Sequence, residues 1–354
     1  MSGSSFPVSL GLLADPRALH EPIVVEGFDR TALRELLRSM LRIRAVERKL
    51  ADGRRDGLIG GPVHLGVGQE AVAVGVSHAL RAGDRVFGAH RSHSHLLALG
   101  SDVRKLLAEV LGKDTGHSRG MGGSMHLWDQ PNGFFGSVPI VAGTVPLAVG
   151  AGLAAKMQGG DDVAVAYLGD GAVEEGVVHE SLNLSRMLKA PVIFVVENNL
   201  FASHMHVSIR QPRDSTARFA AANDMPFEVV DGNDVATVAR AAGRLVAHAR
   251  GGGGPAFLEA VTYRWYGHVD WREDIDVGVN RSRDDVEHWR RRDPVARLAR
   301  AMIVAGYLTD AEHQGMAEEL HRAVETAWEQ AVANPYPAPA ALLERVYAPP
   351  KVRS

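Results

Sequence analysis

The 354-residue sequence contains no cysteine. This absence excludes disulfide bridges, thiolate metal sites and a cysteine nucleophile, and it agrees with a reducing compartment. A long apolar run is also missing: the most apolar later stretch, residues 145–157, is short and glycine-interrupted, and residues 1–13 lack a basic start followed by an apolar core. We therefore expect no export signal, no membrane span and a cytoplasmic location.

Charge of one sign is not concentrated anywhere in the chain. The 39 basic and 42 acidic residues give a formal net charge of −3 and are spread along the sequence. Without a basic stripe to neutralise a phosphate backbone, nucleic acid is not an expected partner. With 45% hydrophobic residues, the chain can bury the core of one large or two modest domains.

The hydrophobic pattern alternates between two periods. Residues 31–50 place apolar side chains at helical spacing, which predicts an amphipathic helix. Further along, helix-like runs cover residues 71–80, 103–111, 145–157, 174–188 and 236–250, and short apolar runs cover residues 85–89, 163–168, 192–196, 227–230 and 256–262. Strands alternating with helices predict an α/β fold, with a mostly parallel sheet covered by helices on both faces.

The ends of the chain differ from its centre. Residues 1–30 form an irregular lead, residues 31–270 carry the alternating pattern, and residues 271–354 resemble a charged helical tail. In this tail Ser282 and Thr309 are candidate N-caps, and Glu312 stands at capping-box spacing from Thr309. We predict an α/β domain with helical N-terminal and C-terminal extensions, and the last long helix is expected to end before residues 334–339.

Polar residues follow two neighbouring apolar runs. The first run leads into Gly169-Asp170-Gly171, and the second leads into Asn198-Asn199. Because ligands of open α/β sheets bind beyond the carboxyl ends of the strands, Asp170 and Asn199 should converge on one site. A carboxylate and an amide oxygen suit Mg²⁺, and glycines let backbone amides approach a diphosphate. The sequence therefore predicts a site for a Mg²⁺-diphosphate.

This motif resembles the thiamine diphosphate fingerprint, with residues 172–197 separating its two halves. Most of the chain is similar to alpha subunits of the thiamine diphosphate-dependent decarboxylating dehydrogenase component of 2-oxo acid dehydrogenase complexes, of the pyruvate/acetoin type. The resemblance implies the thiamine diphosphate-binding fold. It also implies that Asp170, Asn199 and the Phe201 carbonyl bind Mg²⁺, while Gly171 and Ala172 contact the diphosphate.

Segments outside the fingerprint carry the same resemblance, including the glycine-rich stretch 120–126. His64 matches a histidine at the reactive end of the cofactor, and His268 matches an active-site histidine that also contacts it. The further cofactor contacts that the resemblance implies are His90 and Arg91 near the diphosphate, Pro139 beside the aminopyrimidine, and Val141 as the wedge that bends the cofactor. His93 is a further catalytic candidate, with ordering of the loop around the diphosphate as its alternative role.

Three departures from the family pattern bear on the substrate. His90 stands where these subunits commonly have tyrosine, Phe201 stands where many have tyrosine, and residues 203–206, Ser-His-Met-His, differ from the usual pyruvate-type sequence. Pyruvate, a related 2-oxo acid and acetoin therefore all remain open as the small-molecule substrate.

The resemblance also implies a partner. The glutamate that activates the cofactor belongs to a second domain in this family, and the chain has room for one such α/β domain only. We therefore expect a separate beta subunit that carries this glutamate, an α₂β₂ assembly, and a lipoyl-bearing acyltransferase as a possible further partner that accepts the acyl group.

Three alternatives to a dehydrogenase subunit stay open. A thiamine diphosphate-dependent carboligase of a biosynthetic pathway would use the same cofactor without a lipoyl acceptor. A zinc enzyme could use His90, His93 and His95, whose spacing is H-x-x-H-x-H and for which no cysteine competes. A third possibility is an assembly subunit that has lost its chemistry, which the intact set of site residues disfavours.

Overall fold

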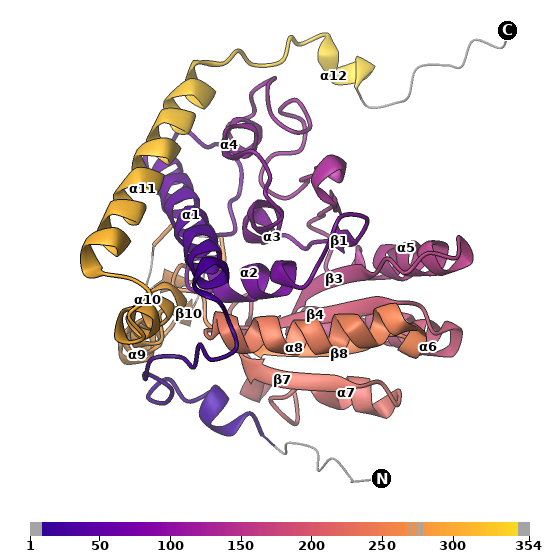
Figure 1. The fold of residues 1–354 in the computed structure, drawn as a ribbon. Coiled ribbons are helices and arrows are strands. Elements are labelled where there is room, and N and C mark those ends of the chain that lie inside the picture. The colour runs from indigo at the N-terminus through magenta and orange to yellow at the C-terminus, as the bar shows by residue number, and fades with distance from the viewer. Residues whose placement is uncertain (1–8, 270, 273–274, 277–278, 346–354) are drawn as a thin grey trace, which may run out of the picture.

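The computed structural model describes residues 9–269, 271–272, 275–276 and 279–345, arranged as one sheet covered by helices (Figure 1). Its helices are α1 (Arg30–Arg55), α2 (Glu70–His78), α3 (His93–Ala98), α4 (Val103–Val110), α5 (Val145–Met157), α6 (Gly176–Leu188), α7 (Ala217–Ala222), α8 (Val235–His248), α9 (Arg283–Arg291), α10 (Pro294–Val304), α11 (Asp310–Ala333) and α12 (Ala341–Glu344). Its strands are β1 (Arg85–Phe87), β2 (Phe134–Gly136), β3 (Ala164–Gly169), β4 (Val192–Asn198), β5 (Phe201–Ala202), β6 (Met205–His206), β7 (Phe227–Asp231), β8 (Ala256–Val261), β9 (Ile275–Asp276) and β10 (Val279–Asn280). Short 3₁₀ turns lie at Gly11–Leu13, Gln130–Asn132, Ala172–Glu174 and Val207–Ile209, and a π turn lies at Ala249–Gly253.

The main sheet has the strand order β2-β1-β3-β4-β8-β7, and every neighbouring pair in it is parallel. The central strands β3, β4 and β8 are buried almost throughout, as expected for strands covered on both faces. The predicted α/β class and parallel sheet are confirmed. Two antiparallel pairs, β5 with β6 and β9 with β10, lie outside this sheet.

The alternation of side chains along β3 divides the core in two. Val165 and Tyr167 pack into one cluster with residues of α1, α2, α8, α10 and α11, whereas Ala166 and Leu168 pack into a second cluster with residues of α5, α6 and α7. Figure 1 shows α8 and α2 on one side of the strands and α5 and α6 toward the other. Burial on both faces explains why these strands read as continuous apolar runs in the sequence.

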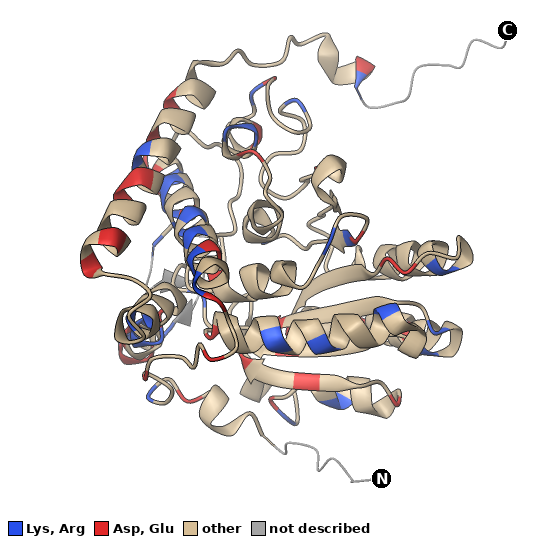
Figure 2. Cartoon of the chain, viewed as in Figure 1, with Lys and Arg blue, Asp and Glu red and all other residues tan. Residues whose placement is uncertain are grey.

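The helical extensions pack on each other. Helices α1 and α11 lie side by side, and Figure 2 shows basic residues of α1 facing acidic residues of α11. Arg34 lies 3.0 Å from Glu312, and Lys49 lies 2.5 Å from Glu325. Such half-buried pairs at the surface add little stability, so the apolar residues between the helices hold this contact.

The predicted helix starts and stops are confirmed. The Ser282 side chain caps α9, and Thr309 and Glu312 form the expected capping box on α11. Helix α11 ends at Ala333, directly before the predicted break. Within the part of the chain that the structure describes, no helix is both long and apolar enough to cross a membrane.

Three elements of the main fold escaped the sequence pattern: α3, β2 and α7. Each has six residues or fewer, which is too short for a helical or alternating period to repeat. The most consequential of these is α3, because the sequence indicated a loop around His93 and the structure has a helix beginning there.

The sheet topology positions the candidate site. From β1 the chain crosses to β2 on one side and then returns to β3 on the other side of β1. The strand order therefore reverses at β1, and open α/β sheets bind ligands at such a point, beyond the carboxyl ends of the strands. The segments that follow β1, β3, β4 and β8 all leave the sheet at this edge.

Candidate cofactor-binding and catalytic site

The two loops that carry the predicted metal ligands are in contact. Asp170 follows β3 and Asn199 follows β4, and these strands are adjacent and parallel. A Cβ atom at Gly171 would lie 2.5 Å from the Cβ of Ala202, so only glycine allows the two loops to pack this closely. The structure thus places Asp170 and Asn199 on touching loops at one edge of the sheet, as the sequence predicts.

Asp170 is almost fully buried, with 1% of its surface exposed. Burial raises the pKa of this carboxyl, and the guanidinium of Arg210 opposes the shift. Arg210 forms ion pairs with both Asp170 and Glu174. The positive charge of Arg210 therefore already compensates the carboxylate that is predicted to bind Mg²⁺.

Asn199 is held by neighbours on both sides of its amide. Its Oδ1 accepts a hydrogen bond of 3.2 Å from the backbone N–H of Phe201, and its Nδ2 donates to Gln69 Oε1 at 3.3 Å. The carboxylate of Asp170 and the amide oxygen of Asn199 are oxygen donors that suit Mg²⁺. Gly171 has no side chain, so a diphosphate could approach the backbone there. The ligand roles of Asp170, Asn199 and Phe201, and the contacts of Gly171 and Ala172, stay predictions.

Arg91 ties together the segments that carry His64 and His268. Its Nη1 donates to the carbonyl of Leu65 at 2.6 Å, and its Nη2 lies 3.4 Å from the carbonyl of His268. The backbone N–H of Trp265 also donates to Val67 at 2.9 Å. The predicted role of Arg91 in binding the diphosphate stays a prediction, but the structure gives this side chain a positioning role as well.

Three histidines converge from separate segments. The ring centroids of His64 and His90 are 4.6 Å apart, those of His64 and His268 are 5.0 Å apart, and those of His90 and His268 are 5.4 Å apart. His204 approaches this group, with its ring centroid 6.1 Å from that of His268. Two predicted catalytic histidines thus share one cluster with His90.

The environment keeps this cluster uncharged. Burial, followed by the nearby charge of Arg91, lowers the pKa of His64 to about 2 and that of His90 to about 3, and the same causes lower the pKa of His268. These imidazoles are neutral at physiological pH, so each can donate from one nitrogen and accept at the other.

The lowered pKa values make a prediction about stability. Below the ordinary histidine pKa of 6.5, the unfolded chain binds protons that the folded cluster does not, so the free energy of unfolding should fall as the pH drops from 6.5 toward about 3. Well below pH 6.5 each histidine contributes a slope of about 1.4 kcal/mol per pH unit.

Urea unfolding at a series of pH values measures how the free energy of unfolding depends on pH. In a His90→Tyr variant this slope should be smaller by the contribution of one histidine. An unchanged slope in that variant would contradict a neutral His90 in the folded chain.

His93 and His95 do not join His90. Both are fully buried on α3. His93 hydrogen-bonds Ser124 Oγ at 2.8 Å and Glu47 Oε2 at 3.3 Å, and His95 stacks on Tyr167 with ring centroids 3.7 Å apart. The zinc site expected as an alternative from His90, His93 and His95 is therefore not assembled, because a helix turns the last two side chains into the core.

The bonds of His93 support a structural role. Ser124 lies in the glycine-rich segment 120–126, and Glu109 holds the start of this segment. The Glu109 carboxylate accepts from the backbone N–H groups of residues 118, 120, 122 and 123. His93 thus helps to fix this segment through its hydrogen bond with Ser124, while its catalytic role stays a prediction.

Pro139 and Val141 follow β2 at the same edge of the sheet. Val141 is 48% exposed. The Thr144 hydroxyl, three residues on, donates to the carbonyl of Gly88 at 2.7 Å and ties this turn to the end of β1. An exposed apolar side chain on a fixed turn fits the predicted wedge, a role that stays a prediction.

Sequence reasoning missed four buried residues that position the site: Gln69, Arg210, Glu259 and Arg264. Arg264 is fully buried and donates to the carbonyls of Ser203 at 2.7 Å and Tyr266 at 2.9 Å, so it joins the turn after β5 to the segment of His268. An arginine beside tyrosine at the end of an apolar run was a visible signal for Arg264. Arg210 lies in an irregular stretch that offers none.

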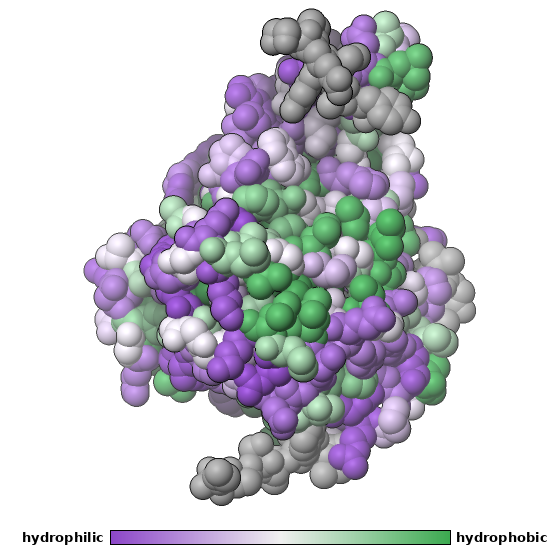
Figure 3. All heavy atoms as spheres, turned by 90° about the vertical axis from the view of Figure 1, so that its right-hand side faces the viewer, coloured by the Kyte–Doolittle hydropathy of each residue, from purple (hydrophilic) through white to green (hydrophobic). Residues whose placement is uncertain are grey.

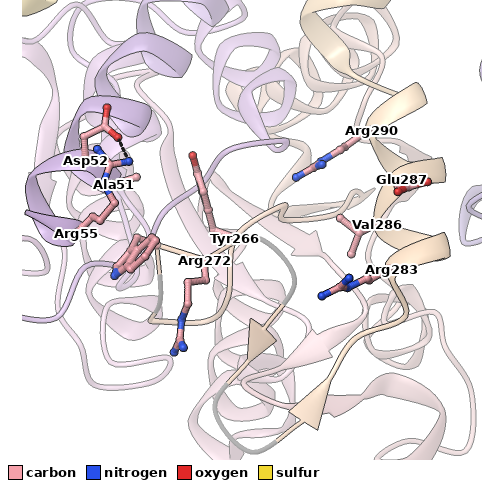
Figure 4. A pocket seen from close by; sticks show the side chains of 10 residues that line it. Ala51, Asp52, Arg55, Tyr266, Arg272, Arg283, Val286, Glu287 and Arg290 are labelled. Carbon is pink, nitrogen blue, oxygen red and sulfur yellow. Dashed lines mark ion pairs between the residues drawn. The ribbon is translucent and has the colours of Figure 1, made fainter.

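A cavity of about 540 Å³ lies beside the His268 segment, between α1 and α9 (Figure 4). Figure 4 shows Tyr266 projecting into it, with Arg55 and Asp52 on one side and Arg283 and Arg290 on the other. Its lining residues are Ala51, Asp52, Arg55, Tyr266, Trp271, Arg272, Arg283, Val286, Glu287 and Arg290. None of the predicted site residues lines this cavity.

An exposed apolar face borders the site. Figure 3 shows hydrophobic side chains gathered on the side of the molecule where α5 and α6 lie. Strongly exposed members of this face are Ile140, Val141, Leu147, Met157, Leu184 and Met187. An exposed apolar face of this kind is typical of a protein interface.

The chain is similar to known proteins over most of its length. The family model of the dehydrogenase E1 component matches residues 38–340. The alpha subunit of acetoin:2,6-dichlorophenolindophenol oxidoreductase from Bacillus subtilis is 38% identical over 328 residues, which cover 91% of this chain and 96% of that protein. The alpha subunit of the pyruvate dehydrogenase E1 component from Rhizobium meliloti is 38% identical over 301 residues, or 85% of each chain. The chloroplastic subunit alpha-3 of the pyruvate dehydrogenase E1 component from rice, Oryza sativa subsp. japonica, is 34% identical over 357 residues, covering 98% of this chain and 83% of that protein.

Proposed function

The chain belongs to the dehydrogenase E1 component family, and we propose that it is the alpha subunit of a thiamine diphosphate-dependent dehydrogenase acting on pyruvate, a related 2-oxo acid or acetoin. The observation that carries this proposal is the contact between the Asp170 loop and the Asn199 loop, with the His64–His268 cluster at the same edge of the sheet. The names of the bacterial relatives support the two substrate classes.

Each part of the site has a proposed task. Asp170, Asn199 and the Phe201 carbonyl would hold Mg²⁺, and Gly171, Ala172 and Arg91 would face the diphosphate. Pro139 and Val141 would support the bend of the cofactor. The cofactor, when bound, supplies an electron sink for cleavage of the bond next to a carbonyl carbon.

The histidine cluster would act on the substrate. A neutral His64 and a neutral His268 can each donate a hydrogen bond to a substrate oxygen and hold it in one orientation. Because the pKa values of both rings are lowered, each ring has one N–H to donate and one nitrogen lone pair to accept a proton or hydrogen bond.

A beta subunit completes the proposed site. The named relatives are alpha subunits, so a partner chain is expected, and we propose that it carries the activating glutamate in an α₂β₂ assembly. The apolar face over α5 and α6, which includes Leu147 and Met187, is a candidate for part of that contact. A lipoyl-bearing acyltransferase as acceptor and a cytoplasmic location are parts of the same proposal.

The substrate test uses the chain co-expressed with its beta subunit. Pyruvate, a branched-chain 2-oxo acid and acetoin are each supplied with a lipoyl-domain acceptor and with an artificial electron acceptor. Turnover that depends on thiamine diphosphate and an acceptor supports the proposal. Formation of a carbon–carbon bond without any acceptor would instead favour the carboligase, and no cofactor-dependent turnover would refute both.

A histidine variant tests the catalytic assignment. His64→Gln in this complex should lower kcat by about 10²–10³-fold, because a positioned proton donor is lost, while bound thiamine diphosphate stays at the wild-type level. His179→Gln is the matched control, since His179 of α6 packs on Phe219 of α7 and is not one of the three clustered histidines. A kcat for His64→Gln within about twofold of wild type would show that His64 has no catalytic part.

A further inference from the structure

His90 gives the cluster a third imidazole, and the three rings are arranged as metal ligands are. Each of His64, His90 and His268 offers one ring nitrogen, and these nitrogens lie within 4.8 Å of one another. The rings meet at 62–80°, so none is stacked on another. Tetrahedral zinc, with bonds of about 2.0–2.1 Å, needs nitrogens about 3.4 Å apart, which small ring rotations would supply.

The fixed backbone around the cluster and the unsatisfied ring nitrogen of His64 favour the binding of a ligand. The segments of His64 and His268 are already fixed by Arg91, so the cost of ordering the site is largely met by the fold. His64 is 7% exposed, and its Nδ1 has no hydrogen-bond partner in the part of the chain that the structure describes. A buried nitrogen without a hydrogen-bond partner costs free energy, so a ligand from outside the chain would stabilise it.

The chemistry of the donors selects the metal. Three neutral imidazoles suit Zn²⁺, whereas Mg²⁺ requires oxygen ligands and near-octahedral geometry. Three protein ligands leave a fourth position for water or an anion. Arg91, whose Nη2 lies 3.5 Å from His268 Nδ1, repels a dication and so weakens its binding.

We propose that His64, His90 and His268 form a zinc site, separate from the Asp170–Asn199 site, whose occupation inhibits the enzyme. The inhibition rests on the proposed function, because it requires that His64 and His268 act on the substrate. The binding itself does not: it depends only on the three side chains. In this proposal His90 is the decisive residue, since it adds the third ligand.

The test measures zinc binding to the complex of this chain with its beta subunit. The complex is first treated with a chelator and kept free of thiamine diphosphate, then titrated calorimetrically with Zn²⁺. Wild type should bind about one Zn²⁺ per alpha chain, and Co²⁺ bound in its place should show the visible absorption of a tetrahedral site. An excess of Mg²⁺ should not displace either ion.

Four variants locate the ion. His90→Tyr and His64→Gln should each weaken Zn²⁺ binding by about a hundredfold or more, since each removes a ligand. His204→Gln is the matched control and should bind as wild type, because His204 lies outside the trio. Asp170→Ala should also retain zinc.

Several outcomes would overturn the zinc site: no stoichiometric zinc in the wild type, wild-type affinity in His90→Tyr, or loss of zinc in Asp170→Ala. Failure of the dehydrogenase assay would not by itself affect these binding results, so the two proposals can fail independently. If zinc binds as expected but turnover is unaffected by it, the inhibitory part of the proposal is wrong.

Discussion

Replacing Asp170 by alanine is expected to lower the affinity of the alpha–beta complex for magnesium and thiamine diphosphate by about a hundredfold or more, and activity should fall with it. Loss of an outer partner of a metal ligand already costs 10- to 100-fold in affinity, and Asp170 is a proposed direct ligand. The buried carboxylate also offsets the charge of Arg210, so the variant leaves that guanidinium paired with Glu174 alone.

The measurement is the cofactor content of the purified complex, followed by calorimetric titration of the cofactor in the presence of Mg²⁺. Glu174→Gln is the matched control, because Glu174 also pairs with Arg210 but is not a proposed ligand. Asp170→Asn separates the loss of charge from the loss of shape. Wild-type cofactor affinity in Asp170→Ala would remove the basis for the magnesium site.

Replacing Glu259 by alanine should cause the largest loss of stability, about 3–5 kcal/mol, the range seen when one partner of a buried charged network is removed. Glu259 is fully buried in β8, and its carboxylate accepts four hydrogen bonds. The donors are the Asn198 side chain at 2.8 Å, the Ser215 hydroxyl at 2.7 Å, and the backbone N–H groups of Thr216 at 2.8 Å and Ala217 at 3.0 Å. Alanine leaves all four without this acceptor.

Urea unfolding gives the free energy difference. Glu228→Ala on the neighbouring strand β7 is the matched control, because Glu228 pairs with Arg244 on the surface and such pairs contribute about 1 kcal/mol or less. Since Asn198 directly precedes Asn199, cofactor affinity should fall in Glu259→Ala as well. Equal stability of the two variants would show that the network around Glu259 is not important to the fold.

The sequence was most informative where a local pattern repeats. The apolar runs at residues 163–168 and 192–196 became the buried strands β3 and β4, because strands covered on both faces must be apolar on both faces. Helix α5 has the predicted bounds, Val145–Met157, and Thr309 with Glu312 forms the predicted capping box. Short elements without a full period, such as α3, were missed.

Part of the candidate site follows from the same local information. Asp170 and Asn199 each directly follow a strand, and parallel strands end at one edge, so their nearness required only the correct order of β3 and β4. The apolar runs in the sequence do not predict the order of the strands in the sheet. The contact of Gly171 with Ala202 shows how close the two loops come.

The sequence by itself determined the fold class, the strands and helices with full periods, and the fingerprint at Asp170 and Asn199, because these depend on residues that are neighbours along the chain. Only the tertiary structure decided that His64, His90 and His268 meet, that His93 and His95 turn into the core, and that Arg210 pairs with Asp170. These groupings join segments up to about two hundred residues apart. Their cause is the packing of loops at one edge of the sheet, which no local spacing encodes.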